Sequence, residues 1–290
     1  MIKFQNIFSF KKIVKPVIYE LLYGPHLLAF GAASIIITAQ LLLEAKKVDF
    51  FFPFLIYLIA YSAYLYNRYK EIEEDFRVVP ERVMHLRNYF AFVPYILLTI
   101  FMFLLFVSFY FLLSKKYLLS VGIIGLFLGG ILYSKWVKEQ TKYIPLLKNF
   151  YVALEWTFPL IIIPLYCSLS YDLPLLTFSI FVFLKTFIMN SFFDLKDISI
   201  DSQKKLKTLP VLWGTANSLF LYIVATIISY VFLFISIILK VLPKPVYGLF
   251  IWFIVDLIIF FRAKYFFSYS LYFVKGIEFL TWPFLIMLFK

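Results

Sequence analysis

Charged residues are scarce in this 290-residue chain: Asp, Glu, Lys and Arg together make up 15% of it, whereas hydrophobic residues make up 63%. Soluble domains carry about a quarter charged residues and are about half apolar. No polar stretch is long enough to house a soluble domain, which excludes an ordinary globular enzyme. The composition instead predicts a single transmembrane domain over residues 1–290, which makes the chain an integral, multi-pass protein of the cell membrane.

Cysteine and histidine are almost absent. The single cysteine, Cys167, lies in an apolar run, so an intrachain disulfide is excluded. The two histidines, His26 and His85, have no second ligand at metal-binding spacing, so the sequence does not indicate a histidine metal centre.

The net charge of +12 is distributed in a way that argues against nucleic acid. Lysines and arginines are spread over many short loops between apolar runs and are not gathered on one soluble face. Anionic membrane lipids and phosphate groups are therefore the expected partners.

The apolar runs predict an all-α polytopic protein whose helices enclose a central cavity. A span needs about 20 residues, and nine runs approach this length: 24–43, 50–67, 89–113, 117–134, 148–168, 173–193, 214–240, 245–262 and 267–289. With nine spans, 19 of the 28 basic residues fall in loops on the side of the N-terminus and seven on the other, which predicts a cytoplasmic N-terminus. The lysine-containing stretch 1–16 is expected to lie on the cytoplasmic membrane surface.

Two acidic clusters follow the second and sixth predicted spans. The run NSFFDLKDISID carries Asp194, Asp197 and Asp201, and NRYKEIEED carries Asn67, Glu71 and Asp75. If each stretch is helical, spacings of three and four residues place its oxygen ligands on one face. Clustered carboxylates at a membrane boundary are costly unless a cation binds them, which favours Mg²⁺. A solvated loop with helix-capping aspartates is the alternative.

The two clusters share one local pattern. Asn67 stands four residues before Glu71, and Asn190 stands four residues before Asp194. The spans before them cross in the same direction, so the pattern favours a parallel repeat of helices 1–4 and 5–8, followed by a ninth helix. Such a repeat would bring the clusters face to face.

At these motifs the sequence resembles the UbiA superfamily of intramembrane prenyltransferases. Its second motif, D-x-x-D-x-x-x-D, is met by Asp194, Asp197 and Asp201 and is followed by KTLPVLWG. Its first motif, N-x-x-x-D-x-x-x-D, is met by Asn67 and Asp75 with Glu71 in place of an aspartate. Arg68 stands where many members carry a further aspartate, and Pro80 and Arg82 resemble the proline and arginine that trail this motif.

The resemblance implies Mg²⁺-dependent transfer of a prenyl group from a polyprenyl diphosphate to a small-molecule or lipid acceptor, such as an aromatic or quinone precursor, at a site that faces the cytoplasm. Asp194 and Asp197 would be catalytic, and the two motifs would hold the metal. Four basic side chains are candidates to contact the diphosphate, although Arg82, Lys138 and Lys142 could each equally be an ordinary positive-inside loop charge, the interpretation that is favoured for the two lysines. The implied metal ligands are Asn67, Glu71, Asp75, Asp194, Asp197 and Asp201, and the implied diphosphate ligands are Arg68, Arg82, Lys138 and Lys142.

Two other functions remain open at this point. Arg68 and Glu71 depart from the first motif, so the chain could be a catalytically silent or repurposed member of that superfamily. Charges inside the predicted spans also suit a transporter, although the carboxylates cluster at one surface and not at the midplane. Lys275 and Glu278 are expected to pair. Glu155 and Asp256 could line the acceptor pocket or reach the membrane boundary from misplaced helix ends, and neither is assigned a catalytic role.

Overall fold

The computed structural model describes residues 20–21, 23–43, 47–78, 80–167, 170–265 and 269–290. Within these residues the chain forms helices and no strand, as predicted. The predicted surface segment 1–16 lies outside the described residues.

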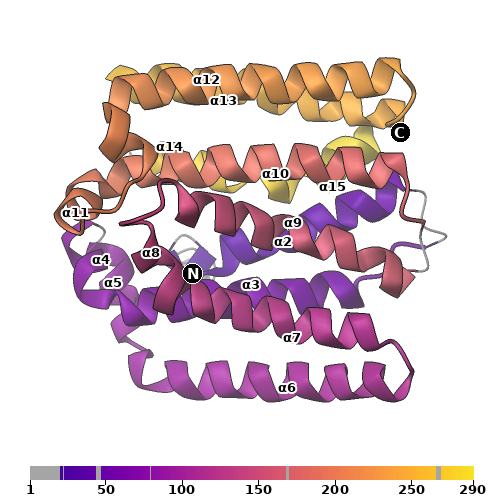
Figure 1. Cartoon of the computed structure of the whole chain (residues 1–290), viewed down its shortest axis with the longest axis horizontal. Coiled ribbons are helices and arrows are strands. Elements are labelled where there is room, and N and C mark those ends of the chain that lie inside the picture. The colour runs from indigo at the N-terminus through magenta and orange to yellow at the C-terminus, as the bar shows by residue number, and fades with distance from the viewer. Residues whose placement is uncertain (1–19, 22, 44–46, 79, 168–169, 266–268) are drawn as a thin grey trace, which may run out of the picture.

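The long helices lie side by side along the length of the molecule, and several short ones gather at one end (Figure 1). Packed pairs include α2 with α3 and α15, α9 with α10, and α12 with α13. The long elements are α2 (His26–Leu42), α3 (Phe51–Lys70), α6 (Val93–Leu113), α7 (Tyr117–Leu132), α9 (Leu147–Cys167), α10 (Leu173–Phe193), α12 (Leu209–Ile238), α13 (Phe250–Tyr265) and the bent pair formed by α14 (Tyr269–Gly276) and α15 (Glu278–Leu288). The short ones are α4 (Ile72–Val78), α5 (Pro80–Arg87), α8 (Lys138–Gln140), α11 (Ile198–Gln203) and the single turns η1 (Phe90–Phe92), η2 (Tyr133–Val137), η3 (Asp194–Asp197) and η4 (Lys244–Leu249).

Local sequence signals set several helix ends. Asp172 caps α10, because its carboxylate accepts a hydrogen bond from the backbone N–H of Leu175 at 3.1 Å. After α6 the chain reverses at Lys115, whose φ of 61° is left-handed and cannot continue a right-handed helix. The break within the last apolar run falls at Ile277, where α14 and α15 meet at 46°.

Fewer helices than the predicted nine are long and apolar enough to count as membrane spans. Within the described residues, six helical segments are long and apolar enough to cross a membrane, and the bent pair α14 and α15 makes a seventh. The six segments are Phe90–Leu113, Tyr117–Gln140, Leu147–Cys167, Leu173–Gln203, Leu209–Ile238 and Lys244–Tyr265. Apolar helix α2 is shorter, with 17 residues, and α3 has 20. Helices thus occur at all nine predicted places, but nine crossings and the orientation of the N-terminus are not confirmed.

The outer surface is strongly apolar. In span Phe90–Leu113 only 28% of the most apolar stretch is buried, and side chains such as Phe106 and Leu113 are exposed. A contiguous apolar surface of this extent is unfavourable in water and matches the acyl chains of a lipid bilayer.

The core contains four charged residues in one network. Lys185, Asp256, Lys275 and Glu278 are fully buried, at 0% exposure. Lys275 lies 2.5 Å from both Asp256 and Glu278, and Lys185 lies 2.8 Å from Glu278 and also contacts Asp256. The predicted Lys275–Glu278 pair is therefore confirmed. It belongs to a network of two lysines and two carboxylates, with no net charge, that joins α10, α13, α14 and α15.

Removing one charge from this network is expected to be severe. Lys185→Met leaves two buried carboxylates facing one lysine, which should lower the free energy of unfolding by about 3–5 kcal/mol. The double variant Lys185→Met with Glu278→Gln restores neutrality and should recover much of that loss. Reversible unfolding in mixed detergent micelles measures both, and equal losses in the two variants would contradict a charge-balance role.

Candidate functional site

Two interrupted helices bring the acidic clusters to one end of the bundle. Helix α3 ends at Lys70, and the chain turns at Glu71 into α4 and α5. Helix α10 ends at Phe193 and continues as the 3-10 turn η3 and then α11. These short elements lie together with α8 at the left end of the bundle in Figure 1. The acidic clusters, 119 residues or more apart in the sequence, thereby line one polar cavity.

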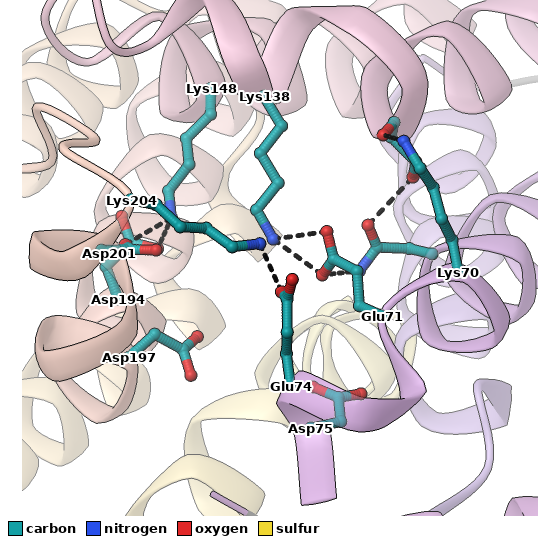
Figure 2. Close-up of polar contacts among 12 residues, drawn as sticks. Lys70, Glu71, Glu74, Asp75, Lys138, Lys148, Asp194, Asp197, Asp201 and Lys204 are labelled. Atoms are coloured by element: carbon teal, nitrogen blue, oxygen red, sulfur yellow. Dashed lines mark hydrogen bonds and ion pairs between the residues drawn. The ribbon is translucent and has the colours of Figure 1, made fainter. Parts of the chain in front are cut away.

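The first cluster is organised around Glu71. Lys138 donates to both Glu71 carboxylate oxygens, at 2.6 and 2.7 Å, and the Asn67 amide donates to Glu71 at 3.2 Å. The Ser134 hydroxyl donates to the Asn67 side-chain oxygen at 2.9 Å. Figure 2 shows Lys138 reaching down between the two clusters to this carboxylate. The longer arm of Glu71 therefore still aims its carboxylate into the cavity.

Two other carboxylates of this region have their own cations. Asp75 pairs with Arg82 across the α4–α5 turn at 2.5 Å, and both side chains line the polar cavity. Glu74 pairs with Lys204, which follows α11 and thus tethers the two acidic regions to each other (Figure 2).

The second cluster is organised around Lys148. This lysine is only 5% exposed and lies 3.0 Å from Asp194 and 2.7 Å from Asp201. The Asn149 amide donates to the other Asp194 oxygen at 2.7 Å. Asp194 and Asp201 are thus two carboxylates on one buried cation, while Asp197 pairs with its neighbour Lys196.

Asp201 differs from the other two aspartates in its position. Asp194 and Asp197 line the polar cavity, whereas Asp201 is buried behind Lys148 and lies outside the lining. The physical reason is the 3-10 turn over Asp194–Asp197, which departs from the continuous α-helix on which the single-face expectation depended.

A π-helical turn at Tyr133–Val137 supplies the cation of the first cluster. In a π-helix residues five apart lie over one another, and Tyr133 and Lys138 are five apart. Both side chains line the polar cavity. Such turns occur frequently at functional sites, and this one places a phenol ring and an ammonium group on the same wall.

Three of the four predicted diphosphate ligands lie in the cavity wall. Arg68, Arg82 and Lys138 line it, and Arg68 also donates to the backbone carbonyl of Tyr23 at 2.5 Å. Lys142 lies outside the lining at an exposed position, where it pairs with Glu139. A hydrogen bond with Glu139 raises the pKa of Lys142.

Several lining residues were not singled out from the sequence. Lys148 and Lys196 are cations, and Asn149 and Tyr133 are polar groups of the same wall. The sequence signal for Lys148 was weak, because it stands among loop lysines at a predicted helix start. Its burial distinguishes it, and burial is not visible in the spacing.

The oxygen donors of the lining suit Mg²⁺, which prefers carboxylate and amide oxygens with water or phosphate completing its shell. Asp194 and Asp197 face the cavity from one side, and Asn67, Glu71 and Asp75 face it from the other. Among the described residues, no three acidic, histidine or cysteine side chains are close enough together to share one ion. Each carboxylate is instead held by a lysine or arginine in this conformation.

A second, apolar cavity adjoins the polar one. Five residues border both: Tyr64, Asn67, Tyr133, Val152 and Asn190. Beyond them the walls come from α2, α3, α7 and α9 and are mostly aliphatic or aromatic, including Ala32, Ile56, Ile59, Ala60, Ala63, Leu126, Gly130, Tyr151, Glu155, Trp156 and Pro159. The two cavities together suit an amphiphilic ligand with a charged head and an apolar tail.

The two histidines meet at one carboxylate beside this site. His26 lies 3.1 Å from Glu20, and His85 contacts the other oxygen of the same carboxylate. The hydrogen bond with His26 is the largest of the contributions that hold the pKa of Glu20 below its ordinary value, against the opposing effect of burial. Sequence spacing could not show this pairing, because 59 residues separate the histidines.

Comparison with known proteins supports the resemblance. The profile described as the UbiA prenyltransferase family matches residues 25–270. A structure from a study of digeranylgeranylglyceryl phosphate synthase in membranes shares the fold, with a TM-score of 0.50 and 13% identity over 95% of this chain and 96% of that one. A search of curated protein sequences gives no match.

The buried position of Lys148 gives a direct test of the second cluster. Lys148→Met leaves Asp194 and Asp201 without their shared cation, which should lower the free energy of unfolding by about 3–5 kcal/mol. Thermal unfolding of the purified protein in detergent measures the change.

Lys142→Met is the matched control, because its ion pair is exposed. This variant should unfold at the wild-type temperature. A Lys148→Met protein as stable as the control would show that the two aspartates do not need this cation.

Proposed function

This chain belongs to the UbiA prenyltransferase family, and on that premise we propose that it transfers a prenyl group from a polyprenyl diphosphate to an acceptor within the membrane in a Mg²⁺-dependent reaction. The polar cavity would bind the diphosphate and the apolar cavity the hydrocarbon chain. The observation that carries the proposal is the direct junction of these two cavities at Asn67, Tyr133 and Asn190.

The charge of the polar cavity supports an anionic ligand. Its lining holds five cations, Arg68, Arg82, Lys138, Lys148 and Lys196, against four carboxylates, Glu71, Asp75, Asp194 and Asp197. The net positive lining attracts a diphosphate, and its low-dielectric walls strengthen each contact. A transporter would need its binding site near the midplane, whereas this cavity is lined by residues such as Asp75, Arg82 and Lys138 of α4, α5 and α8, which lie at one end of the bundle (Figure 1).

The reaction begins when the allylic carbon–oxygen bond of the donor breaks and the diphosphate leaves with the electron pair. Arg82, Arg68 and Lys138 would contact its oxygens and stabilise the negative charge that develops. Mg²⁺ held by Asp194 and Asp197 on one side, and by Asn67, Glu71 and Asp75 on the other, would neutralise further charge on the leaving group. Asp201 and Lys142 lie outside this lining.

Aromatic rings at the cavity junction suit the carbocation. Tyr64 and Tyr133 border both cavities, and Trp156 lies just beyond them with its indole N–H donating to the Tyr64 hydroxyl at 3.0 Å. The negative face of an aromatic ring stabilises a nearby cation, and the apolar walls exclude water that would quench it.

The acceptor and the membrane orientation follow from the sequence expectations. An aromatic or quinone precursor is the acceptor class that the resemblance favours. The bias of basic residues places the polar cavity toward the cytoplasm, where a water-soluble diphosphate product is released.

Asp194→Asn tests the proposed function. Loss of one carboxylate should reduce prenyl transfer at least 100-fold, because the variant replaces a charged two-oxygen ligand of the proposed metal by a neutral amide with one oxygen. The assay uses purified protein in detergent with radiolabelled polyprenyl diphosphates of several lengths and a panel of acceptors, with Mg²⁺ present or removed by chelation. Removal of Mg²⁺ should abolish transfer by the wild type.

Asp172→Asn serves as the matched control, since Asp172 caps α10 at the opposite end of that helix and Asn is an equally good cap. It should keep wild-type activity. A wild-type protein that transfers nothing from any donor, or an Asp194→Asn variant with full activity, would refute the proposed function.

A further inference from the structure

Glu155 is the unusual charge of the apolar cavity. It lies on α9 among aliphatic and aromatic walls and is only partly buried, so the cavity reaches it. The other carboxylates of the helical core, Asp256 and Glu278, are held by lysines. In the part of the chain that the structure describes, Glu155 has no lysine, arginine or histidine within ion-pair distance. An ionisable group left without a counter-charge at such a place is costly and indicates function.

The neighbourhood of Glu155 is shaped for its carboxyl group. A Cβ atom at Gly129 would lie 2.1 Å from Glu155 Oε1 and 3.1 Å from the Tyr151 hydroxyl oxygen, so a larger residue there would displace the carboxyl end of Glu155. The Tyr151 hydroxyl donates to the Gly129 carbonyl oxygen at 3.1 Å and is also a hydrogen-bond partner of Glu155, so its one proton serves one of these two acceptors at a time. Gly129 and Tyr151 thus border the carboxyl of Glu155, which lines the cavity.

The position along α9 places Glu155 close to the reaction. Val152 borders both cavities, and Glu155 lies one helical turn further, a rise of about 4.5 Å. A donor whose diphosphate occupies the polar cavity would have its allylic carbon near this border. Glu155 therefore faces the region where an acceptor must meet that carbon.

We propose that Glu155 binds the hydroxyl group of the acceptor and takes its proton, so that the chain prenylates oxygen. This inference rests on the proposed function and replaces the aromatic acceptor that the resemblance favours by an amphiphile with a free hydroxyl. The hydroxyl oxygen forms the new bond to the allylic carbon once the carbon–oxygen bond to diphosphate has broken. The diphosphate leaves with that electron pair, and the hydroxyl proton passes to the Glu155 carboxylate and then to solvent through the polar cavity.

Only Glu155 is suited to this step among the carboxylates that line the two cavities. Glu71, Asp75, Asp194 and Asp197 are each held by a cation, and protonating any of them would leave that cation uncompensated. Glu155 carries no such cost. Its hydrogen bond with Tyr151 orients the carboxyl group that would meet the acceptor.

The test compares two acceptors with the same chain, 1-dodecanol and 4-dodecylphenol, using geranylgeranyl diphosphate and Mg²⁺ with the purified protein in detergent. Glu155→Gln should lower kcat/KM for the alcohol about 100-fold or more, because a general base contributes about 10²–10⁴. The loss for the phenol should be tenfold smaller, since a more acidic hydroxyl depends less on a base. The KM for the donor should stay within about threefold of wild type.

Matched variants keep the test decisive. Glu139→Gln removes an exposed carboxylate that lies outside both linings and should change neither rate. Gly129→Ala should displace the carboxyl and reproduce the alcohol-selective loss, whereas Gly125→Ala, whose Cβ would meet no atom within 4 Å, should not. Thermal unfolding shows whether each variant is folded. If Glu155→Gln does not fold, the comparison of Gly129→Ala with Gly125→Ala replaces it as the test.

Several outcomes would overturn the inference and leave the proposed function standing. One is equal loss with both acceptors, and another is a change in donor KM alone. A third is a wild-type product joined through carbon. A fourth is a wild type inert toward both hydroxyls that still transfers to another acceptor and loses that activity in Asp194→Asn. If Asp194→Asn matches wild type with every acceptor, the proposed function itself fails.

Discussion

Charge compensation inside an apolar protein is the constraint on which this structure depends. The buried Lys148 forms ion pairs with both Asp194 and Asp201. Lys138 donates hydrogen bonds to both carboxylate oxygens of Glu71. Removing such charges from water costs several kcal/mol for each ion unless a partner of opposite sign is held in good geometry. The lysines come from α8 and α9, Glu71 and Asp194 follow the ends of α3 and α10, and Asp201 lies in α11, so these pairs also fix how five elements meet.

Interruptions of the regular helices help to position the polar side chains of the site. The turn at Glu71, the π-helical turn at Tyr133–Val137 and the 3-10 turn at Asp194–Asp197 all fall at the polar end of the bundle. Each break turns a polar side chain inward where a regular helix would rotate it elsewhere. The apolar cavity lies where α2, α3, α7 and α9 run as continuous helices, so regular helices form its walls, whereas irregular elements form much of the wall of the polar cavity.

The helices and the pairing of the two acidic clusters could be predicted from the sequence, because apolar runs and the Asn67 and Asn190 spacings are local patterns. The exposed site of Lys142 and the burial of Asp201 could not, since a charge in a loop reads the same whether it faces water or a cavity. The burial of Lys148 is hidden for that reason. For Glu155, inside a predicted span, the sequence allows a place in the acceptor pocket but assigns no catalytic role. The proposed parallel repeat remains a prediction.

The internal ion pairs also mean that the polar cavity already satisfies its own cations. On the proposed function, a diphosphate would have to take Lys138 and Arg82 away from Glu71 and Asp75, so part of its attraction would go into breaking contacts that already exist. When the product left, the same pairs would close again. The resident carboxylates would therefore compete with the product for these cations and weaken its binding.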